Sequence, residues 1–364
     1  MLESIIYFPS DKLVKIPLIH KKSGNHYIFK GIYLSIMPNR MIMTRAPLRI
    51  TFVGGGTDLP FYYEKRDYGA VVSAAINRYI YVNVNKKFDD KIRVSYSRTE
   101  IVDGIEEIEH PTVRESLRLL DITKGIEVVS ISDIPSRGTG LGSSSAFLVA
   151  LLHALHSYRG EFTSNEELAR EAVKIEREIL KEPGGRQDQY MAAYGDLNFM
   201  KFMRDGSVDV QTIVSHDSNI ERIEESLLLL YLGRERDSTD IHRDQIKSSN
   251  GKMEIYDKMR GLAEETHKAV YEGNVDILAK LIHDNWLLKK SLSEKISYRW
   301  IDNLYSRALR LGAKGGKVVG AGGGGFLLLV ADPELHGSIA KELGLTKTSF
   351  RFSHAGSRVI FVGD

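Results

Sequence analysis

The residues best suited to chemistry form one continuous stretch, in which three glycines at alternate positions precede three serines: Pro135-Ser136-Arg137-Gly138-Thr139-Gly140-Leu141-Gly142-Ser143-Ser144-Ser145-Ala146. Backbone N–H groups in such a loop, together with the positive end of a following helix, favour an anion. Glycine permits the φ values that the loop needs and lets a phosphate approach the backbone. Serine hydroxyls can bind phosphate or a divalent metal that bridges phosphates. The stretch therefore predicts a nucleoside triphosphate site.

The segments beside this loop indicate a strand, a loop and a helix in succession. Residues 126–131 are rich in β-branched side chains and predict a strand, whereas the apolar run 147–155 predicts a buried helix. A glycine-rich turn before a serine-capped helix is the alternative, because short glycine motifs often arise by chance. The loop lacks the GK[ST] ending of a Walker A motif, and it lacks the acidic residue that follows in a dinucleotide-binding fold.

Two carboxylates downstream are candidates for catalysis and metal binding. Asp188 follows a glycine pair in the segment Gly184-Gly185-Arg186-Gln187-Asp188-Gln189, and its plain interpretation is an acid at the N-terminus of a helix. Glu176 lies beside the apolar stripe of a predicted helix. A Glu in that position most often pairs with a neighbouring cation, here Lys174 or Arg177.

A second glycine motif follows a predicted strand near residue 50. Leu48, Ile50 and Phe52 alternate with polar residues and predict a strand with one solvated face. The strand ends in Gly54-Gly55-Gly56-Thr57-Asp58. The motif predicts either a surface turn with an Asx cap or a backbone that closely approaches a hydroxylated ligand.

A third glycine motif lies between two apolar strands, in the segment Lys317-Val318-Val319-Gly320-Ala321-Gly322-Gly323-Gly324-Gly325-Phe326. A glycine-rich hairpin is the plain interpretation. Packing alone explains four consecutive glycines poorly, because each glycine costs backbone entropy. The four glycines therefore indicate a role beyond packing.

The remaining pattern predicts alternating strands and helices. Strands are expected at residues 69–84 and 91–96, at the buried run 227–232 and as a closing pair within 350–362. Helices are expected at 110–120, 254–271, 275–292 and 301–311, and at a segment that a Ser164–Glu167 capping box opens and Pro183 ends. Residues 234–245 are expected to form a polar loop.

Composition sets limits on the class of protein. The 364 residues suffice for two domains, the net charge is +2, and there is no cysteine. Disulfides, thiolate catalysis and cysteine-based zinc sites are therefore excluded. We expect a cytoplasmic protein that acts on a small molecule, with no nucleic-acid or membrane partner, because no strong charge bias or long apolar run occurs. The oligomeric state is not predicted.

Together, the three motifs resemble those of the GHMP kinases, the superfamily of galactokinase, homoserine kinase, mevalonate kinase and phosphomevalonate kinase. The central loop follows the superfamily pattern Pro-x-x-x-Gly-Leu-Gly-Ser-Ser-x-Ala. Galactokinase-like members have Gly-Glu-His-Thr-Asp in the first motif, whereas this chain has Gly55 and Gly56 in place of Glu and His. This departure argues against galactokinase. The motif looks instead like the branch of D-glycero-D-manno-heptose 7-phosphate kinases, whose relatives include fucokinases.

The resemblance implies a role for particular residues. ATP would be bound by the central loop, at Arg137, Gly138, Thr139, Gly140, Leu141, Gly142, Ser143, Ser144 and Ser145. Mg²⁺ would be held by Ser144 and Glu176, which lies twelve residues before Asp188, as in galactokinase-like members. Asp188 would face the acceptor hydroxyl, with Arg49 as the active-site arginine. The substrate would be bound by Gly55, Gly56, Thr57, Asp58, Arg186, Gln187, Gly323 and Gly324. The resemblance implies that the third glycine loop reaches from the second domain onto the substrate and the first motif.

The resemblance also implies a fold and a reaction. We expect an α+β protein with an N-terminal ATP-binding domain at residues 43–215 and a ferredoxin-like C-terminal domain at 216–364. Residues 1–42 precede the resemblance and are expected to be an extension without assigned function. The implied reaction is phosphorylation of the anomeric hydroxyl of D-glycero-D-manno-heptose 7-phosphate to the 1,7-bisphosphate.

The sequence leaves three alternative functions open. An anomeric kinase of another sugar, such as fucose, would keep the mechanism and change the substrate. A non-catalytic protein of the same fold predicts loss of Asp188, Glu176 or the serines, all of which are present. A dinucleotide-dependent oxidoreductase would depend on the glycine loop alone, and failure to bind NAD(P) would exclude it.

Overall fold

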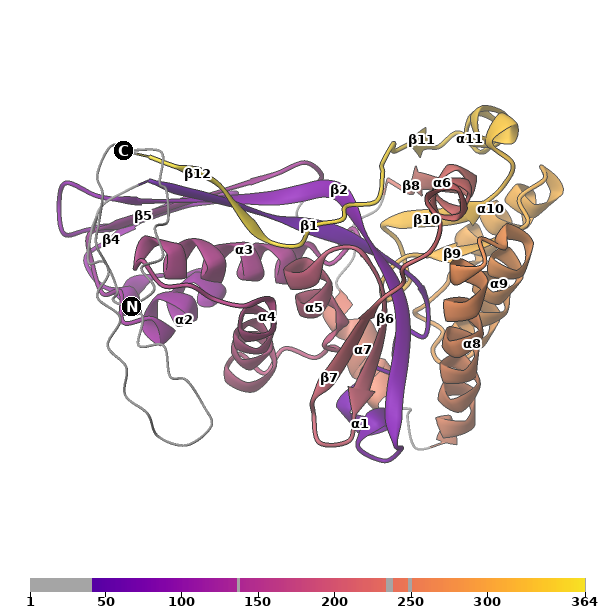
Figure 1. Cartoon of the computed structure of the whole chain (residues 1–364), viewed down its shortest axis with the longest axis horizontal. Helices are drawn as coiled ribbons and strands as arrows, with labels where there is room; N and C mark the ends of the chain where they lie inside the picture. The colour runs from indigo at the N-terminus through magenta and orange to yellow at the C-terminus, as the bar shows by residue number, and fades with distance from the viewer. Residues whose placement is uncertain (1–40, 136–137, 234–237, 248–250, 364) are drawn as a thin grey trace, which may run out of the picture. The chain divides into compact units, whose positions relative to one another are not determined.

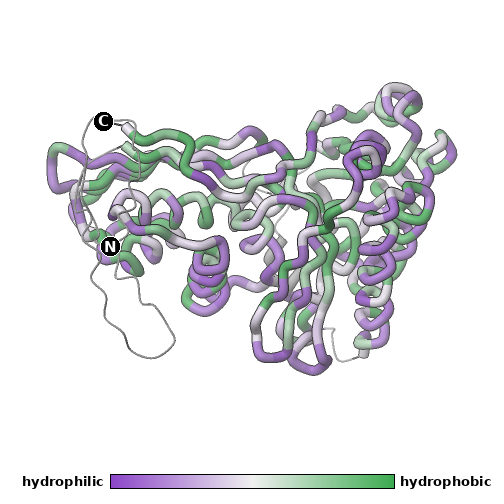
Figure 2. The backbone as a smooth tube through the Cα atoms, viewed as in Figure 1, coloured by the Kyte–Doolittle hydropathy of each residue, from purple (hydrophilic) through white to green (hydrophobic). Residues whose placement is uncertain are grey.

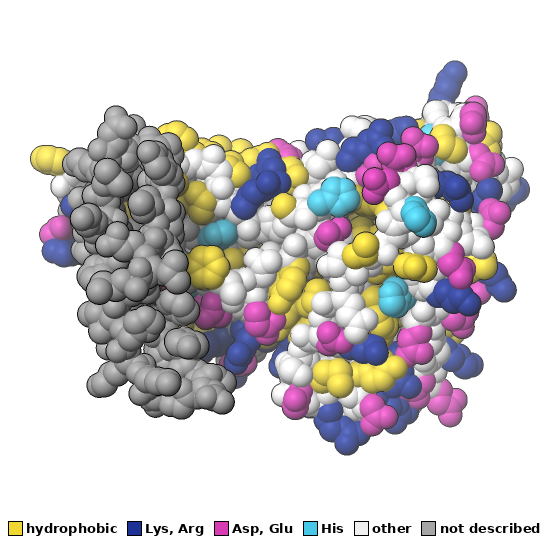
Figure 3. Space-filling view, in the orientation of Figure 1, with side chains coloured by type: hydrophobic (Ala, Val, Ile, Leu, Met, Phe, Trp, Pro, Cys, Tyr) yellow, Lys and Arg dark blue, Asp and Glu magenta, His cyan; other side chains and the backbone are white. Residues whose placement is uncertain are grey.

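The computed structural model describes residues 41–135, 138–233, 238–247 and 251–363. The extension, apart from residues 41 and 42, therefore lies outside the described residues, as does Arg137. Within the described ranges, no helix combines the length and the apolar character that crossing a membrane requires. On the face shown in Figure 3, acidic and basic side chains of the described residues are interspersed, in keeping with the small net charge.

A large sheet is built around two long antiparallel strands, β1 (Ile42–Val53) and β2 (Tyr68–Lys86). Its path runs β12-β1-β2-β5-β3-β4, and β6 and β7 extend it from β2. The other strands have these bounds: β3 Ile92–Ser95, β4 Thr99–Val102, β5 Ile126–Ser132, β6 Leu197–Met203, β7 Val208–Thr212 and β12 Arg358–Val362. The inner strands β1 and β2 are mainly buried because helices cover the sheet (Figures 1 and 2).

The helices between the strands of this sheet pack around one helix, α3 (Ser143–Tyr158), which contacts both β1 and β2. The run predicted as a buried helix at 147–155 is confirmed, and it starts at the serines. The other segments are α1 Pro60–Tyr63, η1 Ile105–Glu107, α2 Pro111–Leu119, α4 Asn165–Val173, η2 Lys174–Ile179 and α5 Gln187–Tyr194. The capping box at Ser164 and Glu167 is also confirmed.

A second sheet has four antiparallel strands in the order β11-β8-β10-β9. The strands are β8 Leu227–Tyr231, β9 Gly315–Val318, β10 Phe326–Val330 and β11 Thr346–Lys347. Numbered within the unit, this order is 4-1-3-2, with helices between the first and second strands and between the third and fourth. That order is ferredoxin-like, so the expected α+β fold class is confirmed.

The helices before and between the strands of the second sheet lie mostly on the right of Figure 1, whereas α7 is drawn nearer the middle of the view. They are α6 Asp217–Ser226, α7 Ser238–Lys247, α8 Met253–Tyr271, α9 Val275–Lys290, α10 Arg299–Arg310, η4 Pro333–Leu335 and α11 His336–Leu343. The helices predicted at 254–271, 275–292 and 301–311 are confirmed as α8, α9 and α10. We propose that the two sheets mark two domains that divide near residue 215.

Two sequence predictions are wrong. Residues 238–247 form the helix α7 where a polar loop was expected, because four-residue spacing of Ile241 and Gln245 buries one side of an otherwise polar segment. Residues 350–362 do not supply a pair of strands. Phe352 makes an isolated bridge with Ile76, and β12 pairs with β1 in the large sheet. The chain thus ends in the sheet in which the described part begins.

Candidate active site

The central loop adopts the backbone conformation that its glycines predict. Gly138, Gly140 and Gly142 have φ values of 69°, 77° and 77°, which side chains other than glycine rarely adopt. Gly142 is the N-cap of α3. A Cβ at Gly142 would lie 3.3 Å from the carboxylate of Asp188, so glycine also lets the loop approach this acid. The N-terminus of a 16-residue helix is thereby open to an anion.

The structure places most of the expected ATP-binding residues on one cleft. Its walls include Gly138, Gly140, Gly142, Ser143, Ser144 and Ser145. Thr139 and Leu141 are fully buried and do not line it. The Thr139 hydroxyl has no hydrogen-bond partner among the described residues, and the Leu141 carbonyl accepts a hydrogen bond from the N–H of Arg49. Nothing is described for Arg137.

The cleft has an aromatic end and a charged end, where Arg49 and Arg177 accompany the two carboxylates. Tyr96, His110 and Phe147 line one part, with the His110 ring centroid 4.7 Å from that of Tyr96 and 5.4 Å from that of Phe147. Glu176 and Asp188 line the other part, beside the serines. The cleft can therefore accept a flat ring at one end and phosphates with a cation at the other.

Asp188 and Arg49 form a two-point ion pair across the start of α5. The Nε of Arg49 donates to Oδ1 of Asp188 at 2.9 Å, and Nη2 donates to Oδ2 at 2.8 Å. Nη1 of Arg49 donates to the carbonyl of Gly140 in the central loop. Arg49 lies on β1, 139 residues from Asp188. The arginine therefore fixes the orientation of the carboxylate relative to the loop.

Glu176 lies in a turn of π-helix, η2, that continues α4. Such turns are rare and occur often at functional sites. The carboxylate is 1% exposed. It accepts hydrogen bonds from Ser145 Oγ at 2.8 Å, from Ser144 Oγ at 3.3 Å and from the side-chain amide of Gln189. Nη2 of Arg177 lies 3.5 Å from Oε2 of Glu176.

These oxygens suit Mg²⁺ in number and kind. Within the described ranges, no cluster of three or more His, Cys, Asp or Glu residues could hold a metal ion by itself. Mg²⁺ bound with a nucleotide needs only one or two protein oxygens, because phosphates and water supply the rest. The carboxylate of Glu176 and the hydroxyl of Ser144 are adjacent, 3.3 Å apart, and both residues line the cleft. The residues therefore fit the metal that the sequence implies.

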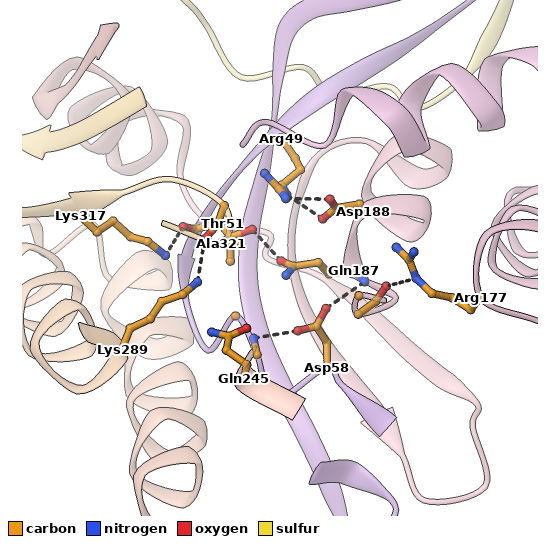
Figure 4. Close-up of a pocket in the computed structure, with 15 residues that line it drawn as sticks. Arg49, Thr51, Asp58, Arg177, Gln187, Asp188, Gln245, Lys289, Lys317 and Ala321 are labelled. Atoms are coloured by element: carbon orange, nitrogen blue, oxygen red, sulfur yellow. Dashed lines mark hydrogen bonds and ion pairs between the residues drawn. The ribbon is translucent and has the colours of Figure 1, made fainter. Parts of the chain in front are cut away.

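A second, smaller pocket meets this cleft at Asp188 (Figure 4). Arg49, Arg177 and Asp188 line both cavities. Of the residues expected to bind substrate, four line the small pocket: Gly55, Gly56, Asp58 and Gln187. A hydroxyl in the small pocket and a phosphate chain in the cleft would thus meet at the Asp188–Arg49 pair. We call the small pocket the acceptor pocket.

Asp58 is a buried acid on the wall of the acceptor pocket. It accepts hydrogen bonds from the backbone N–H groups of Gly56 at 2.8 Å and Gln187 at 3.4 Å. Burial raises the pKa of the Asp58 carboxyl above its ordinary value; the hydrogen bond from Gly56 opposes this shift, and the charge of Asp188 adds to it. A carboxyl of this kind can accept or donate a hydrogen bond to a sugar hydroxyl.

The other four residues expected to bind substrate do not line the acceptor pocket. The Thr57 hydroxyl is buried and bonds to the backbone of Gly54 and Ala70, so it holds the turn after β1. Arg186 points to the carbonyl of Gly206 and stacks on Tyr63. Gly323 and Gly324 lie further along their loop, which reaches the pocket through two earlier residues, Gly320 and Ala321.

The third glycine loop instead packs against the central loop. A Cβ at Gly320 would lie 2.6 Å from the Cα of Gly140. Gly325 likewise approaches the carbonyls of Gly138 and Thr139. The central loop follows β5 of the large sheet and the third loop joins β9 and β10 of the second sheet, so the two sheets are linked by this contact between loops.

Sequence reasoning missed five polar residues of the acceptor pocket: Thr51, Arg177, Gln245, Lys289 and Lys317. Lys317 Nζ donates to the carbonyls of Thr51 and Phe52 at 2.9 and 3.1 Å, and Lys289 Nζ donates to that of Gly320 at 2.7 Å. Burial lowers the pKa of Lys317 far below its ordinary value, as do the charges of Lys289 and Arg49. Of these residues, only Lys317 could have been identified from the sequence, because a lysine stands there beside the apolar residues of a predicted strand.

Comparisons with known proteins identify the family of the chain. The model for the GHMP kinases N terminal domain matches residues 106–196, and the model for GHMP kinases C terminal matches 266–345. The chain is 30% identical over 338 residues to D-glycero-alpha-D-manno-heptose 7-phosphate kinase of Campylobacter jejuni, covering 87% of this chain and 98% of that protein.

Two further similarities are more distant. The chain is 26% identical over 354 residues to L-fucokinase/L-fucose-1-P guanylyltransferase of Bacteroides fragilis, covering 85% of this chain but only 37% of that longer protein. A crystal structure described as a D-glycero-D-manno-heptose 1-phosphate kinase from Bacteroides thetaiotaomicron shares the fold, with a TM-score of 0.74 and 24% identity over 89% of this chain and all of that one. By its similarity to the Campylobacter jejuni kinase over nearly the whole of that protein, the chain belongs to the GHMP kinases, phosphotransferases that act on an alcohol group.

Proposed function

We propose that the protein is a sugar kinase that transfers the γ-phosphoryl group of ATP to the anomeric hydroxyl of D-glycero-D-manno-heptose 7-phosphate and forms the 1,7-bisphosphate. The observation that carries the proposal is the Asp188–Arg49 pair, which lies where the acceptor pocket meets the nucleotide cleft. The name of the relative at 30% identity supports the choice of sugar. An anomeric kinase of an unphosphorylated sugar is the alternative, which the fucokinase relative favours.

The central loop would hold the triphosphate. Its backbone N–H groups and the N-terminus of α3 face the cleft, where they would bind phosphate oxygens. The base would lie at the aromatic end, against Tyr96 and Phe147. Glu176 and Ser144 would hold Mg²⁺, which supplies neutralisation of phosphate charge when it is bound.

Asp188 would act on the acceptor. Its carboxylate accepts the hydrogen of the anomeric hydroxyl while the oxygen attacks the γ-phosphorus, and the bond from that phosphorus to the β-phosphate oxygen breaks to release ADP. Arg49 holds the carboxylate at two points and places a positive charge beside the transferred group. Gly55 and Gly56 leave room for the sugar, and Asp58 and Gln187 offer hydrogen bonds to its hydroxyls.

The test measures ADP release from ATP and Mg²⁺ with a panel of sugars and sugar phosphates. We expect turnover with heptose 7-phosphate, and we expect Asp188→Asn to lower kcat about 10²- to 10⁴-fold, the range for loss of a proton acceptor. Asp205→Asn, in an exposed turn, is the matched control and should leave kcat unchanged.

Three results would change the proposal. Turnover only with an unphosphorylated sugar would keep the mechanism and replace the substrate. Full activity of Asp188→Asn would remove the assigned role of Asp188. A protein that binds ATP but turns over no sugar in a broad panel would be a non-catalytic member of the family.

A further inference from the structure

Arg177 lies at the junction of the nucleotide cleft and the acceptor pocket. Among the described residues, five line both cavities: Arg49, Arg177, Asp188, Gly320 and Ala321. Figure 4 shows Arg49 and Arg177 on either side of Asp188. A phosphoryl group that passes from one cavity to the other would therefore pass beside both guanidinium groups.

The π-helical turn η2 brings two consecutive charged residues to the cleft. Glu176 and Arg177 both lie in this turn, and both line the nucleotide cleft. Turns of this kind are rare and occur often at functional sites. The assignment of Glu176 as a metal ligand gives the turn one role, and Arg177 has none so far.

The backbone of the following loop holds the side chain of Arg177. Its Nε donates to the carbonyl of Gly185 at 2.9 Å, and its Nη1 donates to that of Glu182 at 3.3 Å. A Cβ at Gly184 would lie 3.0 Å from Cζ and from Nη2 of Arg177, so the glycine makes room for the guanidinium. The side chain is therefore oriented before a substrate binds, which lowers the entropy cost of using it.

Part of the guanidinium has no hydrogen-bond partner. Arginine has five N–H donors, and the two carbonyls take up one on Nε and one on Nη1. Nη2 lies 3.5 Å from Oε2 of Glu176, which is an ion-pair distance but longer than a charge-assisted hydrogen bond. Within the described residues, Nη2 makes no hydrogen bond, so its donors can bind an anion in the cleft.

The charge of Arg49 is already paired. Its Nε and Nη2 bind the two carboxylate oxygens of Asp188. Glu176 would share its charge with Mg²⁺ when a nucleotide is bound, which leaves the charge of Arg177 for the phosphates. A phosphoryl group in transfer carries negative charge on its three equatorial oxygens. Arg177 can meet that charge from the side opposite Arg49.

We propose that Arg177 is a further catalytic residue, which donates hydrogen bonds to the equatorial oxygens of the phosphoryl group as it moves from ATP to the acceptor. The acceptor oxygen bonds to the γ-phosphorus as the bond from that phosphorus to the β-phosphate oxygen breaks, and the acceptor proton goes to Asp188. Arg177 gives up no proton, because a guanidinium stays protonated in proteins. The proposal rests on the kinase reaction proposed above, whichever sugar is the acceptor.

The first experiment measures steady-state kinetics with the acceptor that the panel of sugars identifies. We expect Arg177→Met to lower kcat about 10²- to 10³-fold, the range for loss of one donor to charge that develops in the transition state. The KM values for ATP and acceptor should change less than about threefold, since the interaction is made chiefly in the transition state. Arg177→Lys keeps the charge but not the planar fork, and should lose less.

Lys174→Met is the matched control. This lysine lies in the same turn, is exposed, and lines neither cavity. The variant should keep the wild-type kcat.

Two kinetic results would show that Arg177 acts only through its neighbours. A raised Mg²⁺ requirement, with kcat unchanged at saturating Mg²⁺, would mean that it only orients Glu176. A raised KM for the acceptor, with kcat unchanged, would mean that it only holds the loop at Gly185. Either result overturns the proposal.

The second experiment measures binding and needs no turnover. ADP with aluminium fluoride and Mg²⁺ imitates a phosphoryl group in transfer, whereas a non-hydrolysable ATP analogue imitates the ground state. In calorimetry, we expect Arg177→Met to weaken binding of ADP with aluminium fluoride about tenfold or more and binding of the ATP analogue less than about threefold. No loss for either ligand, or an equal loss for both, would overturn the proposal.

The two proposals fail separately. If no sugar in the panel is phosphorylated, the proposed function fails, and binding of ADP with aluminium fluoride still decides the role of Arg177. If heptose 7-phosphate is phosphorylated and Arg177→Met keeps the wild-type kcat, the role of Arg177 fails and the proposed function stands. Thermal unfolding shows whether each variant is folded, and Arg177→Lys serves the same comparisons if Arg177→Met is not.

Discussion

At the scale of single residues, the site depends on two carboxylates with different surroundings. Asp188 is held at two points by Arg49 and remains at the junction of the two cavities, whereas Glu176 is buried beneath the serines. Both were selected through the resemblance to galactokinase-like members, in which a Glu precedes the Asp by twelve residues. The hydrogen bonds that orient them, from Arg49, Ser144 and Ser145, join residues at least 31 positions apart in the chain.

Glu176→Gln tests the magnesium role. The glutamine side chain has the same shape as that of Glu176 and can still form hydrogen bonds with Ser144 and Ser145. It lacks the negative charge that favours binding of a hard cation. We expect the Mg²⁺ concentration for half-maximal binding of a non-hydrolysable ATP analogue to rise about tenfold or more, in the range seen when one metal contact is weakened. Glu178→Gln, at an exposed position two residues further on, should leave that concentration unchanged. An unchanged metal dependence in Glu176→Gln would exclude Glu176 as a ligand.

The motifs did not distinguish residues that line the acceptor pocket from residues that stabilise the surrounding fold. Thr57 belongs to the first motif, yet its hydroxyl holds the backbone of the turn. Arg186 is adjacent to Gln187, yet it stacks on Tyr63, outside the acceptor pocket. Lys289 lies in a helix 101 residues after Asp188 in the sequence, and no motif marks it. Neighbours in sequence share a motif, but the backbone direction decides which side chains reach the pocket.

At the scale of elements, the third glycine loop packs against the central glycine loop. Periodicity and glycine content predicted both loops and their flanking strands or helix. They did not predict that the third loop packs on the central loop, because a contact between distant loops leaves no periodic signal in either one.

Gly320→Ala tests this contact. The added Cβ would lie 2.6 Å from the Cα of Gly140, at a φ of +72° that alanine rarely adopts. The loops must separate, and we expect kcat/KM for ATP to fall about 10- to 100-fold, as for a small misplacement in a site. Gly337→Ala is the control, since a Cβ there has no atom within 4 Å. Normal ATP kinetics in Gly320→Ala would show that the loop contact does not set the nucleotide site.

Helices α3 and α4 are joined by a histidine between two acids. His156 lies 2.8 Å from Glu161 and 2.8 Å from Glu171. Burial lowers the pKa of His156, but hydrogen bonds and charges of Glu171 and Glu161 outweigh it, so the pKa is raised overall. Its stabilising contribution is therefore complete below the unfolded-state pKa, about 6.5, and is lost as the pH rises through the folded-state pKa.

His156→Gln should then be more destabilising at acid pH. We expect the difference in unfolding free energy between wild type and variant to shrink as the pH rises from 5.5 to 9, because the pKa of His156 is raised in the folded protein. Denaturant unfolding at several pH values measures it, with the exposed His216→Gln as control. A difference that grows with pH would contradict the assignment.

At the scale of the whole molecule, the described chain folds as two sheets (Figure 1), and a glycine loop of the second sheet contacts the glycine loop that follows β5 of the first. The family resemblance that the three motifs carry implied the α+β class and the ferredoxin-like second sheet, which the periodicity of the sequence alone did not. The return of β12 to pair with β1 was not predictable, because residues 358–362 are short, partly exposed and lack a partner motif in the sequence. Strand pairing over more than 300 residues follows from the topology of the whole chain.

Phosphorus NMR of the product tests the central claim most directly. The protein is incubated with ATP, Mg²⁺ and heptose 7-phosphate, and the new phosphorus signal is examined for coupling to the anomeric proton. The account predicts a product with two phosphate monoesters, the new one on the anomeric oxygen, and none in Asp188→Asn. A new phosphate at another carbon, or an unchanged product yield in Asp188→Asn, would contradict the assignment of Asp188 and the acceptor pocket.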